Sequence, residues 1–111
     1  MTRDQQFAYL DLARKQLISW SSKQNVPLHH IEYVVGFGDD FSLATWLFFE
    51  TDKQRDMADT ANWPTELATL FIETLRSAGY AEEWVSKIRF LHDSHENLLR
   101  NYNGSYFYFL R

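Results

Sequence analysis

The chain contains no cysteine, only 4 glycines and 2 prolines, and no long hydrophobic run. Without cysteine it can form no disulfide, no thiolate zinc site and no thiol nucleophile. Its longest apolar run, residues 46–49, is far shorter than the about 20 residues that a membrane-spanning helix needs. Residues 1–6 also lack the apolar stretch of a secretory signal peptide. These absences favour a reducing compartment, and we expect a cytoplasmic protein.

Aromatic side chains, in contrast, are abundant. They make up 17% of the 111 residues, and 45% of all residues are hydrophobic. Each aromatic side chain can bury about 150–250 Å², so one substantial core can form. A chain of this length is typical of one domain, and we predict a single α+β domain over residues 1–111.

Negative charge is concentrated in the middle of the chain. The whole chain has a net charge of −4, whereas residues 28–66 carry eight acidic and two basic side chains, a net charge of −6. Such a segment repels nucleic acids and anionic membranes and attracts basic protein surfaces. We therefore expect a protein partner, and neither a nucleic acid nor a membrane.

The first half of the chain changes from helical to strand periodicity. Apolar residues recur every three or four positions over residues 4–24, which predicts a helix with Asp4 as its cap. A period of two then predicts a strand over residues 31–37, a turn over residues 36–40 and a second strand over residues 41–49. Both faces of the second strand are apolar, so we expect it to be central and covered on two sides.

The second half contains a helix, a strand, a short helix and a last strand. Residues 53–61 are polar and predict a loop or an irregular helical turn, after which Pro64 begins a helix that ends at Gly79. Residues 84–92 predict a strand, Asp93 or Ser94 caps a short helix, and residues 105–110 predict a last strand after an Asn-Gly turn. The predicted order is α-β-β-α-β-(short α)-β. Two main helices should cover a mainly antiparallel, four-stranded sheet, with a shared core of Leu43, Leu47, Phe49, Phe71, Ile88 and Phe90.

Residues 92–96 are the only concentration of catalytic residue types. His92 and His95 are three positions apart, and His92 and Glu96 four, so a continuous helix would direct them towards one metal ion. Because His92 should end a strand, that geometry is broken, and the alternative interpretation gives these residues to a helix cap. The neighbours His29 and His30 begin a strand and should face opposite sides. We expect no metal, no cofactor and no catalytic residue.

The acidic segment is the candidate binding surface. It supplies two groups of carboxylates at opposite ends of the second strand, one at the hairpin turn and one after that strand. We favour the second group, because Trp63 lies near it as an aromatic anchor of the kind that dominates interfaces. The predicted partner-binding residues are Asp39, Asp40, Glu50, Asp52, Asp56, Asp59 and Trp63.

Two segments resemble a known class of proteins. Asp93-Ser94-His95-Glu96-Asn97, and then residues 101–111 (Asn-Tyr-Asn-Gly-Ser-Tyr-Phe-Tyr-Phe-Leu-Arg), are similar to the endings of small bacterial immunity proteins. Those proteins accompany toxins of contact-dependent growth inhibition and related polymorphic toxin systems. Residues 33–38 (Tyr-Val-Val-Gly-Phe-Gly) and the aromatic strand up to Glu50 are similar in style.

The resemblance covers about half of the chain and carries no functional residues with it. It implies a cytosolic protein that binds a cognate toxin domain and blocks its active site. Many such toxins are nucleases, whose substrate grooves are basic, and an acidic surface suits such a groove. The alternatives are a small intracellular adaptor or regulatory subunit and, third, a metal-dependent hydrolase that uses His92, His95 and Glu96.

Overall fold

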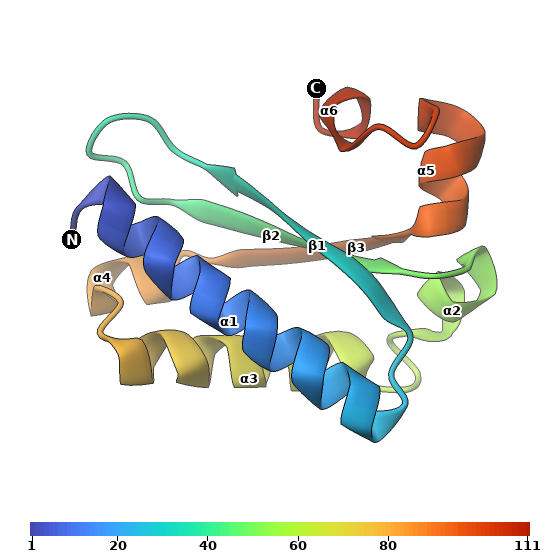
Figure 1. Ribbon diagram of the computed structural model, residues 1–111, viewed down its shortest axis with the longest axis horizontal. Coiled ribbons are helices and arrows are strands. Elements are labelled where there is room, and N and C mark those ends of the chain that lie inside the picture. The colour runs from blue at the N-terminus through green and yellow to red at the C-terminus, as the bar shows by residue number, and fades with distance from the viewer.

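Six helices and three strands follow one another in the computed structural model, which describes residues 1–111 (Figure 1). In chain order they are α1 (Arg3–Gln24), β1 (Leu28–Val35), β2 (Leu43–Phe49), α2 (Asp52–Met57), α3 (Trp63–Ala78), α4 (Glu82–Val85), β3 (Arg89–Ser94), α5 (His95–Tyr102) and α6 (Tyr106–Phe109). The three strands form one sheet in the order β1-β2-β3. The α+β prediction is therefore confirmed.

The prediction of a mainly antiparallel, four-stranded sheet is wrong. β1 and β2 do form the predicted antiparallel hairpin, but β3 pairs with β2 in parallel. Parallel neighbours need a long crossover connection, which α2, α3 and α4 supply here. The sheet is thus mixed and has three strands, with β2 in the centre as predicted.

Residues 105–110 form no strand. The Ser105 hydroxyl accepts a hydrogen bond from the Tyr108 amide at 3.2 Å and thereby caps α6. Tyr106 and Phe109, three positions apart, both contact Phe48 of β2, whereas Phe107 and Tyr108 are exposed. An unbroken aromatic run fits a strand and a short helix equally well, and contacts with the sheet decide between them.

Three further boundaries differ from the prediction. Residues 84–92 are divided between the end of α4 and β3, and the polar residues 53–61 include most of α2. Thr2, not Asp4, caps α1, because its side chain accepts a hydrogen bond from the Gln5 amide at 3.1 Å. The predicted ends of α3 are confirmed, with proline in its first turn and Gly79 at a φ of 104° after its last residue.

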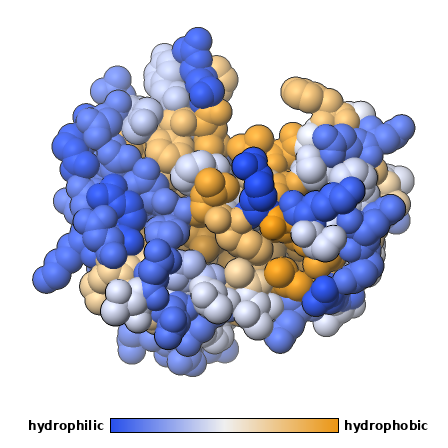
Figure 2. Space-filling view, turned by 180° about the vertical axis from the view of Figure 1, so that it is seen from behind, coloured by the Kyte–Doolittle hydropathy of each residue, from blue (hydrophilic) through white to orange (hydrophobic).

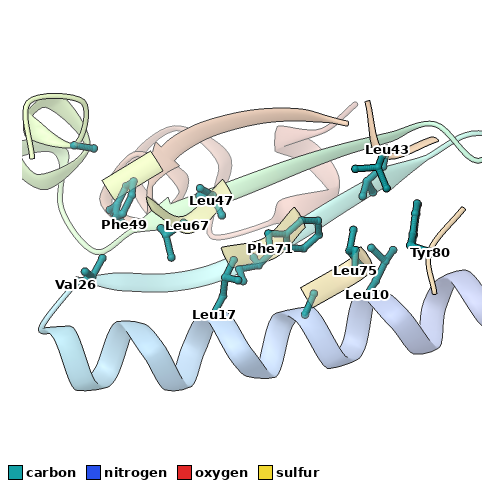
Figure 3. Close-up of a cluster of buried hydrophobic side chains, with 14 residues drawn as sticks. Leu10, Leu17, Val26, Leu43, Leu47, Phe49, Leu67, Phe71, Leu75 and Tyr80 are labelled. Atoms are coloured by element: carbon teal, nitrogen blue, oxygen red, sulfur yellow. The ribbon is translucent and has the colours of Figure 1, made fainter. Parts of the chain in front are cut away.

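The main core lies between the sheet and the helices α1 and α3, which cover the same face (Figures 1 and 3). Leu43, Leu47 and Phe49 of β2 contribute to it, together with Phe71 of α3, as predicted. Ile88 and Phe90, also predicted for the core, are only partly buried and pack against it. Six of the seven residues of β2 are buried, which fits a central strand covered on both sides.

A second, smaller core covers one end of the opposite sheet face. The Phe48 ring centroid lies 4.9 Å from that of Tyr106 and 5.2 Å from that of Phe109, and Phe109 also meets Trp46 at 4.9 Å. Figure 1 shows α5 and α6 above this end, while the end towards the β1–β2 turn carries no helix on that face. The C-terminal segment is thereby fixed next to α2.

Candidate functional site

Carboxylates gather at the ends of β2 and β3, along and just after α2, and at the start of α5. We define the acidic end by these side chains: Glu50, Asp52, Asp56, Asp59, Asp93 and Glu96. Three basic side chains, Lys53, Arg55 and Arg100, lie on the same elements. The acidic end therefore keeps a net charge of −3 when all nine groups are ionised.

Asp52 joins α2 to α5. The Ser94 hydroxyl donates a hydrogen bond to Oδ1 of Asp52, and Nη1 of Arg100 donates to Oδ2 at 2.7 Å. Both bonds favour the ionised carboxylate, first that of Ser94 and then that of Arg100, and they lower the pKa of Asp52. This carboxylate is fixed and is already partly neutralised inside the protein.

Arg55 organises the neighbouring carboxylates. Its Nη1 lies 2.9 Å from Oδ1 of Asp93 and 3.4 Å from Oδ1 of Asp52, and its Nε lies 3.0 Å from Oδ1 of Asp56. The hydrogen bonds to Asp93 and Asp56 raise the pKa of the guanidinium, so it stays charged. One arginine from α2 therefore sets the relative positions of three carboxylates before any partner arrives.

Glu96 and Glu50 complete this end. Oε1 of Glu96 accepts a hydrogen bond from the Asp52 amide at 2.8 Å, and the Glu96 amide donates to the Glu50 carbonyl oxygen at 3.3 Å. The side chains of Glu50 and Asp59 are exposed and form no ion pair within the chain. With Asp56, they are the carboxylates most available to a partner.

The other predicted binding residues are distributed differently. Asp39 and Asp40 lie in the β1–β2 turn, at the opposite end of β2 from α2. Oδ1 of Asp40 accepts a hydrogen bond from the Ser42 amide at 2.9 Å, which lowers the pKa of Asp40. Trp63 is half-buried, with its ring centroid 5.5 Å from that of Phe49, so it borders the core. The structure thus brings together Glu50, Asp52, Asp56 and Asp59, and leaves Asp39 and Asp40 apart.

The histidines are also separated by secondary structure. His92 lies in β3, with its ring 6.0 Å from that of Phe49, whereas His95 begins α5 and stacks on His29 at 3.9 Å. Ser94 between them is fully buried and caps α5 by accepting a hydrogen bond from the Asn97 amide at 3.0 Å. No three His, Asp or Glu side chains converge in a geometry that fits a metal ion.

Sequence reasoning missed several exposed aromatic residues. Phe37 in the β1–β2 turn is 95% exposed, and Phe107 of α6 is 73% exposed. Phe37 lies between two glycines in a predicted turn, a position that itself indicates exposure. Nothing in the local sequence distinguishes Phe107 from its buried neighbours.

Compared with known proteins, the chain matches no family model, no curated protein and no solved structure. None of its helices combines the length and the apolar character of a membrane-spanning segment.

The stacked pair of His29 and His95 predicts a pH effect on stability. Partial desolvation of this exposed ring, and then the neighbouring His95, lower the pKa of His29 below its usual 6.5. The folded state therefore disfavours protonation more than the unfolded state does, so the free energy of unfolding should decrease as the pH falls below about 6.5. Urea unfolding at pH 7.5 and at pH 5.5 checks this, and His29→Gln should reduce the difference between the two. An equal difference in the variant would assign the pH effect to other groups.

Proposed function

We propose that this protein is a binding protein that neutralises a cognate toxin domain by covering its basic active site with the acidic end. The observation that carries the proposal is the fixed arrangement of carboxylates around Arg55, which bonds Asp56 and Asp93 at 3.0 and 2.9 Å. A surface whose charged groups are already positioned loses less conformational freedom on binding. Partners of opposite charge are also steered together at long range.

The internal hydrogen bonds and ion pairs divide the carboxylates of the acidic end into two sets. Asp52 and Asp93 are tied to Arg55, Arg100 and Ser94 and maintain the shape of this end. The carboxylates of Glu50, Asp56 and Asp59 are exposed; Glu50 and Asp59 form no ion pair, and Asp56 bonds Arg55 through Oδ1 alone, so all three can meet basic side chains. The first set supports the surface, and the second set contacts the partner.

The test neutralises only the exposed set. The variant Glu50→Gln/Asp56→Asn/Asp59→Asn should slow association with the cognate toxin domain and flatten the salt dependence of the rate constant. Exposed ion pairs contribute about 0.2–1 kcal/mol each, so we expect affinity to fall by roughly tenfold. Stopped-flow or surface-plasmon measurements at two ionic strengths give both quantities.

A matched control removes the same charge elsewhere. Asp39, Glu73 and Glu83 are exposed, form no ion pair within the chain and lie outside the acidic end. The variant Asp39→Asn/Glu73→Gln/Glu83→Gln should change association much less. Equal effects of the two variants would mean that net charge alone steers the partner, and no effect of either would place the interface on another surface.

A further inference from the structure

The outer edge of β3 has no strand beside it. β3 pairs only with β2, so no strand lies along its other edge; α2 packs against its C-terminal end, where Arg55 meets Asp93. Of its six residues only Ser94 is buried, in contrast to the central strand β2. In Figure 1 β3 lies behind β2, and the reverse view of Figure 2 shows hydrophobic residues across the centre of that side, flanked by hydrophilic ones. A free edge of this kind is a template for pairing with another strand.

The sequence of β3 is complementary to itself in one antiparallel register. If two copies of Arg89–Ser94 pair around Leu91, residue 91 meets residue 91 of the second copy. Arg89 then lies opposite Asp93 of the second copy, on both sides of the twofold axis, and Phe90 lies opposite His92. A register centred one residue away in either direction places no arginine opposite an aspartate.

The faces of the sheet agree with this register. In the pairing of β2 with β3, His92 lies beside Leu47, which faces α1 and α3. Leu91 lies beside Trp46, which faces the other side of the sheet. Since side chains alternate along a strand, Arg89, Leu91 and Asp93 share the face of Trp46, while Phe90 and His92 share the face of the main core. Directly opposite residues in an antiparallel pair point to the same face, so each pair meets on one side of the sheet.

The charges that would meet are available. Arg89 is exposed and forms no ion pair within its own chain. The Asp93 side chain is 17% exposed and accepts bonds from Arg55, the Ser94 amide and Asn97. An ionised carboxylate has about four acceptor positions, so one remains for Arg89 of a second copy.

We propose that two copies of this chain pair through their β3 edges in antiparallel orientation, with the twofold axis at Leu91, to form one continuous six-stranded sheet. The interface is isologous, because each copy presents the same strand to the other. This inference does not depend on the function proposed above. It uses the edge of β3, whereas the proposed toxin surface uses the exposed carboxylates at the acidic end; Asp93 is the one residue of the acidic end that also lies on this edge.

The first test is the molar mass in solution. Light scattering after size exclusion should give twice 13.2 kDa for the wild type at high concentration, with dissociation on dilution. Leu91→Lys places two like charges against each other at the twofold axis and should give the monomer mass. Val34→Lys puts the same charge on an exposed apolar residue of β1, the other edge strand, and should leave the dimer intact.

The second test uses the absence of cysteine and does not require the dimer to be disrupted. Opposite Cα atoms in an antiparallel pair are about 4.5–5.5 Å apart, within the about 4.4–6.8 Å that a disulfide spans. Leu91→Cys should therefore form a disulfide-linked dimer under mild oxidation, and Val34→Cys should not. The proposal is overturned by a wild type that is monomeric at every concentration, by a dimer that Leu91→Lys leaves intact, or by equal crosslinking of the two cysteine variants.

Discussion

Replacing Phe71 with alanine should lower the free energy of unfolding by about 3–5 kcal/mol. Phe71 lies in α3, is fully buried and belongs to the main core. Its ring meets that of Phe90 at 5.5 Å and that of Tyr33 at 6.1 Å, so it bridges the helix layer to β1 and β3. Removing it leaves a cavity that rings on two strands cannot fill without moving the sheet.

Two comparison variants test whether the loss of stability depends on how deeply the replaced phenylalanine is buried. Phe107→Ala removes the same side chain from an exposed position, and we expect a change within about 0.5 kcal/mol. Phe90→Ala should fall between the two, because Phe90 is only partly buried. Urea unfolding monitored by circular dichroism measures all three, and an unchanged midpoint for Phe71→Ala would contradict the position of the core.

The helices and the hairpin follow from local pattern. The three- and four-residue spacing in α1, the proline and glycine that bound α3, and the alternation along β1 and β2 are properties of neighbouring residues. The two apolar faces of β2 likewise predicted a central strand covered on both sides, as observed. These features could be predicted because no distant partner decides them.

The direction of β3 and the form of the last segment depend on distant contacts. Nothing within residues 89–94 specifies a parallel neighbour, since the direction follows from how α3 returns the chain to the sheet. Residues 106–109 become helical where Tyr106 and Phe109 reach Phe48, about 60 residues earlier in the chain. The prediction of a fourth strand over residues 105–110 was wrong for this reason.

The same limit applies to the acidic end. Its charge was evident from the composition of residues 28–66, but its internal neutralisation was not. Arg55 bonds Asp93, which lies 38 positions away in the sequence, and Arg100 bonds Asp52, which lies 48 positions away. Counting charges along the chain therefore overstated the negative charge of Asp52 that is available to a partner. The internally bonded carboxylates can be distinguished from the exposed ones only in the folded structure.

Replacing Phe48 with alanine should release the C-terminal helix α6 while the protein is still folded, and should lower the free energy of unfolding by about 3–5 kcal/mol. Phe48 is fully buried but lies outside the main core. Its ring contacts, with Tyr106 and Phe109, connect α6 to the sheet. An element attached by few apolar contacts opens at a lower free energy than the rest of the fold.

Hydrogen exchange distinguishes this release from a general loss of stability. The amides of Phe109 and Leu110, which donate to the Ser105 and Tyr106 carbonyl oxygens at 3.1 and 3.0 Å, should exchange faster in Phe48→Ala under native conditions. Amides of α1 and α3 should stay protected and lose no more than the fall in the global free energy of unfolding, because Leu17 and Phe71 retain their neighbours. In Phe71→Ala the order should reverse, with α1 and α3 losing protection and α6 changing little. Equal loss of protection throughout both variants would contradict this prediction. It would mean that α6 does not detach from Phe48 independently and that the two faces of the sheet unfold as one unit.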